Sequence, residues 1–255
     1  MKKVFRKDMK DMVPAFAMMA SAFVVLEILL LLGVALNNKG MVNTALYMAV
    51  FAMVVTIAWI LYAAGGVFLR NLRERMYFTQ LEKEGVSVTK TVVYKILYNT
   101  FAIAVFAGAY AGAFFVDLKL LASRFPEEKE GIEQFGIRKM IQGESGDPLV
   151  PAVLTTILEY LTAGFFLVVL VYLAVVITYA FCYRSKLCAI LCVVAYLLLF
   201  MMFYKVSQTI LAGLSGIEMH LAASALNFGT AFVLGIAAIW LLVKRTLPLT
   251  APKQY

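Results

Sequence analysis

The sequence predicts an all-α membrane protein with six transmembrane helices. Of its 255 residues 63% are hydrophobic and only 15% are charged, whereas soluble domains are about 45–50% apolar and about 25% charged. The apolar residues gather in stretches long enough to cross a bilayer, which takes about 20 residues of helix. The basic residues gather between alternate stretches. We therefore expect lipid to be the solvent for most of the chain, and residues 1–255 to form one membrane domain without a soluble domain.

The six predicted spans cover most of the chain. Each is a mostly apolar stretch, and the fourth is long enough to tilt or to extend beyond the bilayer. Their expected bounds are residues 13–36, 44–68, 94–116, 149–181, 187–205 and 219–243.

The distribution of Lys and Arg predicts the orientation. The side of the membrane that holds the N-terminus carries 16 of these residues, and the other side carries 7. Because basic residues are retained on the cytoplasmic side, we expect both termini in the cytoplasm. The net charge of +8 is then explained by contact with anionic lipid, and no nucleic-acid partner is expected.

The segment before the first span, residues 1–12, is basic and amphipathic. The apolar stretch that follows, residues 13–36, is longer than the core of a signal peptide, which has about 7–15 residues, so we expect a retained helix. Apolar side chains in residues 1–12 share one helical face, and basic side chains occupy the rest. This pattern predicts an interfacial helix on the inner leaflet. The alternative is a basic flank that only sets the topology.

The segment between spans two and three, residues 69–93, predicts a cytoplasmic amphipathic helix that ends at Gly85. Apolar residues form a narrow stripe along it, and arginines flank the stripe. The stripe consists of Leu69, Leu72, Met76 and Leu81, and the arginines are Arg70, Arg73 and Arg75. Such a helix either lies on the membrane or docks in the groove of a partner, with the stripe as its contact residues.

The segment between spans three and four, residues 117–148, is expected to be an outer loop. It carries seven acidic and five basic residues. A short amphipathic helix is predicted near residues 132–141, where glycines and a proline follow. We favour a solvated connector over the alternative, a lid above an outer opening.

Two acidic residues lie inside predicted spans, Glu27 in the first and Glu159 in the fourth. A carboxylate is costly in hydrocarbon and usually faces the bundle interior or a cavity. Both are therefore candidates for a polar substrate path or a proton site, and a structural, hydrogen-bonded carboxyl is the alternative. We expect no basic partner at the depth of either residue, because Lys205 and His220 are assigned to the outer boundary of the membrane.

In the third span, Gly108 and Gly112 form a G-x-x-x-G pair, which predicts a closely packed helix face.

Residues that could carry catalysis or hold a metal are scarce. The chain has one histidine and three cysteines, Cys182, Cys188 and Cys192. The cysteines lie near a cytoplasmic boundary, where thiols stay reduced, and neither a nucleophile–base pair nor a metal-ligand set is apparent. We therefore expect that the chain is not an enzyme and binds no metal or cofactor itself.

The whole layout resembles a permease subunit of the ABC-2 family of bacterial ABC transporters. Four segments carry the resemblance: the basic opening, a cytoplasmic segment between spans two and three, a short basic turn between spans four and five, and a basic end to the last span. In order they read MKKVFRKDMKDM (residues 1–12), FLRNLRERMYFTQLEKEGVSVTKTVVYKIL (68–97), CYRSK (182–186) and IAAIWLLVKRTLPL (236–249).

The resemblance implies a multi-subunit transporter in the plasma membrane of a bacterium. The partners would be two cytoplasmic ATP-binding subunits, which hold ATP and Mg²⁺, and a second permease, identical or not. The stripe and arginines of residues 69–81 would couple ATP hydrolysis to the helix bundle. Peptides, drugs or lipids would be the substrates. The residues themselves leave two other hypotheses open: an ATP-independent carrier that uses Glu27 and Glu159, and a membrane scaffold that transports nothing.

Overall fold

The computed structural model describes residues 2–74, 77–83, 85–125, 148–183 and 185–247. In this part of the chain all regular structure is helical, and six helices are long and apolar enough to cross a membrane. The all-α fold and the six candidate spans of the sequence analysis are therefore confirmed.

The first three spans form one group of long helices. α1 (Lys2–Ala35) turns tightly into α2 (Lys39–Arg73), and the short α3 (Tyr77–Lys83) leads into α4 (Val88–Arg124). In the first turn Asn37 has a φ of 53°, a left-handed conformation that asparagine tolerates better than most residues. The next residue caps α2, because the side-chain oxygen of Asn38 accepts a hydrogen bond from the N–H of Met41 at 3.1 Å.

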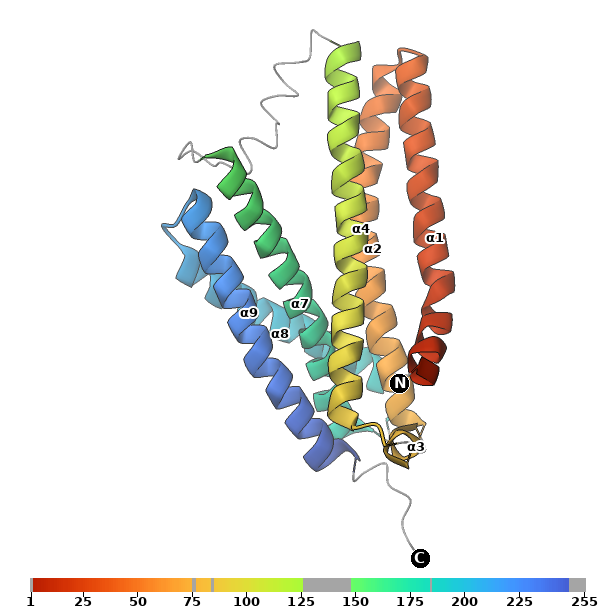
Figure 1. The fold of residues 1–255 in the computed structure, drawn as a ribbon, viewed down its shortest axis with the longest axis vertical. Helices are drawn as coiled ribbons and strands as arrows, with labels where there is room; N and C mark the ends of the chain where they lie inside the picture. The colour runs from red at the N-terminus through yellow and green to blue at the C-terminus, as the bar shows by residue number, and fades with distance from the viewer. Residues whose placement is uncertain (1, 75–76, 84, 126–147, 184, 248–255) are drawn as a thin grey trace, which may run out of the picture.

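The last three spans form a second group. It consists of α7 (Leu149–Cys182), α8 (Cys188–Leu211) and α9 (Gly216–Leu241), and α9 continues into a π-helical turn, η3 (Leu242–Thr246). Figure 1 shows that the two groups meet at the end that carries α3, which we call the α3 end. From there α7 and α9 diverge from α4 toward the opposite end, which we call the far end.

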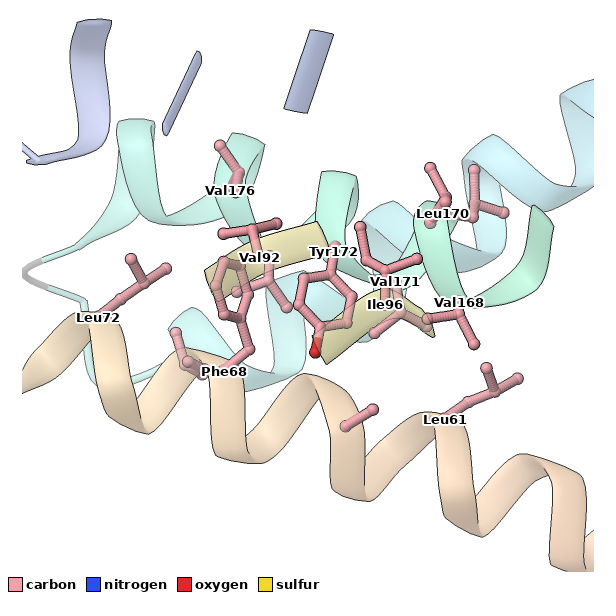
Figure 2. Packing of buried hydrophobic residues seen from close by; sticks show 14 of the residues in the cluster. Leu61, Phe68, Leu72, Val92, Ile96, Val168, Leu170, Val171, Tyr172 and Val176 are labelled. Atoms are coloured by element: carbon pink, nitrogen blue, oxygen red, sulfur yellow. The ribbon is translucent and has the colours of Figure 1, made fainter. Parts of the chain in front are cut away.

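α7 is the helix around which the two groups pack. It contacts α2 and α4 of the first group and α8 and α9 of its own, and 72% of its most apolar stretch is buried. Figure 2 shows the ring of Tyr172 on α7 beside the ring of Phe68 on α2, with Val92 and Ile96 of α4 nearby. The two ring centroids are 4.5 Å apart. This cluster holds the groups together at the α3 end, and a smaller one joins α1, α2 and α4 at the far end.

The observed helices differ from the predicted spans mainly in length. α2 has 35 residues and α4 has 37, or about 50–55 Å at 1.5 Å per residue, whereas the hydrocarbon core is about 30 Å thick. These helices therefore extend beyond the hydrocarbon. Because α4 reaches Arg124, Asp117 belongs to a helix and the prediction that the outer loop begins there was wrong. Residues 126–147, with the helix predicted within them, lie outside the described residues.

The N-terminal segment also differs from its prediction. Residues 2–12 form the first turns of α1, and the helix continues through position 14 without a break. The structure therefore has no boundary that would separate an interfacial helix from the first span.

Candidate functional site

The candidate coupling segment forms a corner between α2 and α4, which we call the α3 corner (residues 69–74, 77–83 and 85–92). α2 ends at Arg73, and α3 ends in a Schellman motif at Gly85. There the N–H of Val86 bonds to the carbonyl of Leu81 at 2.8 Å, and Gly85 has a φ of 74°. The predicted helix stop at Gly85 is therefore confirmed. The segment is two helical pieces, however, and not the single helix that the sequence predicted.

The apolar stripe of this corner faces the protein. Leu69, Leu72 and Leu81 are 7%, 1% and 3% exposed and belong to the main core cluster. The expectation that the stripe contacts the membrane or a partner was therefore wrong for these three residues, because their apolar side chains are buried in the core of the chain itself. The exposed charged side chains of the described corner are four basic ones, Arg70, Arg73, Lys83 and Lys90, and two acidic ones, Glu74 and Glu82, so its outer surface has an excess of basic charge. Arg75 and Met76 lie outside the described residues.

Aromatic side chains attach α3 to the bundle. The ring of Phe78 on α3 packs edge-on against Phe68 of α2 at 6.5 Å and against its neighbour Tyr77 at 5.0 Å. The ammonium group of Lys95, on α4, lies 5.2 Å from the centroid of the Tyr77 ring, within the range of a cation–π interaction. α3 is thus fixed to both α2 and α4.

Buried polar side chains lie just behind the corner. Asn99 on α4 donates to the carbonyl oxygen of Lys95 at 2.9 Å and to the hydroxyl of Tyr172 on α7 at 3.1 Å. Asn71, Lys95 and Asn99 are 1%, 8% and 3% exposed. Buried polar side chains stabilise one arrangement of a helix bundle when they form hydrogen bonds from one helix to another. The Asn99–Tyr172 contact makes such a link between the two groups of helices.

Glu159, the candidate on α7, contacts the only histidine of the chain. Its Oε2 lies 2.5 Å from Nδ1 of His220 on α9. The His220 side chain is 8% exposed and the Glu159 side chain is 28% exposed. The expectation that Glu159 has no partner at its depth was therefore wrong. The sequence signal was present, since both residues lie in the first half of a span that starts at the far end, but the two residues are 61 positions apart.

Glu27, the candidate on α1, lies in the other group of helices. It is partly buried and within electrostatic range of Asp117 on α4, which is 6% exposed. Figure 1 shows α1 and the far end of α7 on opposite sides of α4. The structure therefore does not bring Glu27 and Glu159 together, and a single site that uses both carboxyls gains no support from it.

The other residues singled out in the sequence do not form a site. A Cβ built on Gly108 or Gly112 meets nothing within 4 Å, so in the described structure this G-x-x-x-G face has no packing partner. Cys182, Cys188 and Cys192 are free thiols, and the last two are buried. Among the residues that the structure describes, no three His, Cys, Asp or Glu side chains gather as metal ligands.

Comparison with models of protein families, with curated proteins and with solved structures finds no match for this chain.

Proposed function

We propose that this chain is the membrane-spanning permease subunit of an ABC transporter of the ABC-2 type. It would move a substrate such as a peptide, drug or lipid across a bacterial plasma membrane. ATP hydrolysis on two separate cytoplasmic subunits would drive it, together with a second permease. In this proposal both termini and the α3 corner are cytoplasmic. The observation that carries the proposal is the α3 corner, whose outer surface has an excess of basic over acidic side chains and whose inner surface belongs to the main core.

The corner has the properties that a coupling element needs. A force on its exposed face would pass into the bundle because its leucines and Phe78 are buried among the side chains of α2, α4 and α7. The same core joins the two groups of helices, which diverge at the far end (Figure 1). A movement at the α3 end would therefore change how the far ends are arranged. Coupling between sites requires such an element, with two arrangements that a distant ligand can bias.

Arg70 and Arg73 are the residues proposed to face the ATP-binding subunit. Both are exposed and lie in the last turn of α2. Arginine is favoured at contacts with carboxylates of a partner because its planar guanidinium can form two parallel hydrogen bonds. Leu69, Leu72 and Leu81 would act behind them as packing residues that transmit the movement.

The test is a charge reversal at the corner with a matched control at the far end. The tagged full-length chain would be purified from its native membranes in mild detergent, and ATP hydrolysis and subunit composition would be measured. We expect an ATP-binding subunit to co-purify with the unchanged chain. The R70E/R73E variant should lose most of the bound ATP-binding subunit or its stimulation by the permease. A control K119E/K205E variant, which reverses two charges toward the far end, should retain both.

Two outcomes would contradict the proposal. If no ATP-hydrolysing subunit accompanies the chain after native purification or co-expression with neighbouring ATPase genes, the chain is not such a permease. If it instead forms a stable complex with another membrane protein and no transport is found, the scaffold hypothesis is favoured.

Thermal melting of both variants should match that of the unchanged chain, because Arg70, Arg73, Lys119 and Lys205 are all exposed.

A further inference from the structure

The contact between Glu159 and His220 is an ionisable pair inside the candidate membrane-spanning region. Glu159 belongs to the span Val150–Cys182 and His220 to the span Gly216–Thr246. Oε2 of Glu159 and Nδ1 of His220 are 2.5 Å apart. Ionisable residues within spans are costly and are retained mainly where they serve a pathway or a proton site. Here each side chain satisfies a polar atom of the other.

The pair can bind one proton without losing its hydrogen bond. With a neutral imidazole, Nδ1–H donates to the carboxylate, and the pair carries a net charge of −1. When a proton binds to Nε2, the ring becomes an imidazolium that still donates from Nδ1, and the net charge is zero. This change in net charge requires no ligand other than the proton.

Within the described part of the chain, no other charged group neutralises the pair. Toward the far end, α9 and the helices that pack on α7 carry Glu218 on α9, Lys205 on α8, Asp117, Lys119 and Arg124 on α4, and Lys39 on α2. None of these residues has a hydrogen bond or ion pair with Glu159 or His220 in the described structure. Proton binding therefore removes from the interface of the two helices a charge that no described residue compensates.

The pair lies in the interface between α7 and α9, so its charge affects how these two helices pack. α7 and α9 pack along their lengths, with the rings of Phe165 and Phe228 stacked at 6.0 Å and Val169 against Gly235. Glu159 and His220 continue this interface toward the far end, where α7 diverges from α4 (Figure 1). An apolar interface tolerates a neutral polar pair better than a charged one. The protonation state should thus set how closely the far ends of α7 and α9 pack.

We propose that Glu159 and His220 form a proton-binding site, and that its occupancy changes the packing of α7 against α9 at the far end. The site would make the conformation of the bundle depend on pH. This inference goes beyond the proposed function and does not rest on it, because it concerns the binding of a proton and not of an ATP-binding subunit.

The single histidine makes a direct test possible. The full-length chain would be labelled with ¹⁵N-histidine and placed in lipid nanodiscs, so that each imidazole signal comes from His220. Spectra from pH 5 to pH 8 would be recorded for the unchanged chain, for E159Q and for E218Q, a matched change two residues from His220. We expect a strongly hydrogen-bonded Nδ1 signal and a pH-dependent change in the unchanged chain and E218Q. In E159Q the Nδ1 signal and its pH profile should both differ.

A distance measurement tests the structural part. Spin labels introduced by unnatural amino acids at the exposed positions Leu154 on α7 and Leu221 on α9 would report the separation of the far ends. The distance distribution should differ between pH 5 and pH 8 in the unchanged chain. It should not change with pH in H220Q, which can still form hydrogen bonds but cannot bind the proton.

Either of two results would overturn the proposal. One is a histidine spectrum of E159Q that equals that of the unchanged chain at every pH, which would mean that the pair does not share a proton. The other is a distance distribution of the unchanged chain that is the same at pH 5 and pH 8. Since both can be read without an ATP-binding subunit, they are separate from a failure of the proposed function.

Discussion

The hydroxyl of Tyr179, near the end of α7, donates a hydrogen bond to the backbone carbonyl oxygen of Leu72 at 3.1 Å. Leu72 lies in the last turn of α2, where the carbonyl groups have no partner within their own helix. Both residues are buried. A side chain of the second group of helices thus supplies a hydrogen bond to a carbonyl oxygen at the end of a helix of the first group. This contact lies at the α3 corner, where the proposed coupling would begin.

Replacement of Tyr179 by Phe should destabilise the chain without disturbing its packing. The variant leaves the Leu72 carbonyl buried without this donor, which costs about 1–3 kcal/mol. Thermal or denaturant unfolding in detergent would measure the loss. Y62F is the matched control, since Tyr62 is 65% exposed and should change the stability by less than about 0.5 kcal/mol. An equal effect in both variants would show that the Tyr179–Leu72 bond contributes nothing specific.

Two adjacent glycines should respond differently to the same substitution. A Cβ on Gly65 would lie 2.9 Å from Cγ1 of Val171 on α7, whereas a Cβ on Gly66 would meet nothing within 4 Å. Val171 is β-branched and buried, so it has little freedom to move away.

Both G65A and G66A gain up to about 1 kcal/mol of helix propensity. Only G65A is expected to suffer overpacking, which costs about 1–3 kcal/mol. The difference between the two melting curves should therefore equal that steric cost. If G65A is as stable as G66A, α2 and α7 do not pack as closely as the structure shows.

The sequence was sufficient to predict the candidate spans. A span must supply about 20 mostly apolar residues of helix, and this is a local property that composition along the chain reveals. The same measure cannot separate residues that face lipid from residues that face protein, because both surroundings are apolar. Leu72 and Phe101 illustrate this limit, since both are apolar residues of long helices but are 1% and 67% exposed.

The candidate site was less accessible to sequence analysis. The basic residues Arg70 and Arg73 were expected to flank the apolar stripe, and both are exposed. The leucines beside them were expected at the surface and are buried, because an amphipathic pattern shows which face is apolar but not what covers it. The partner of Glu159 depends on how α7 and α9 tilt and where they begin, which a single sequence does not fix. Its contact with His220 appeared only in three dimensions.

Removal of the Phe78 side chain should loosen α3 selectively. Phe78 is 5% exposed and packs against Phe68, and α3 has only seven residues, too few for an isolated helix to be stable. A Phe→Ala change in a core costs about 3–5 kcal/mol, although the local opening of α3 reports only part of it.

Hydrogen exchange followed by mass spectrometry is the measurement for F78A. Exchange in residues 77–83 should accelerate at least about tenfold, which corresponds to 1.4 kcal/mol, and exchange in α9 should stay unchanged. The control F101A removes a ring that is 67% exposed and should leave residues 77–83 as they are. Uniform acceleration across the chain in F78A would mean that Phe78 supports the whole fold and not the corner.

The hydrogen bond from Asn99 to Tyr172 should contribute modestly to the stability of the contact between the two helix groups. Asn99 also donates to the carbonyl of Lys95 within α4, so Y172F leaves its amide one partner, and the loss should be small. A double-mutant cycle of N99A, Y172F and the combined variant isolates the interhelical part. We expect a coupling energy of about 0.6 kcal/mol and at most about 1.7 kcal/mol, the range found for hydrogen bonds between membrane helices.

A coupling energy of zero would show that the two side chains do not interact in the membrane. A value well above this range would indicate that further buried polar groups near Lys95 depend on the same contact.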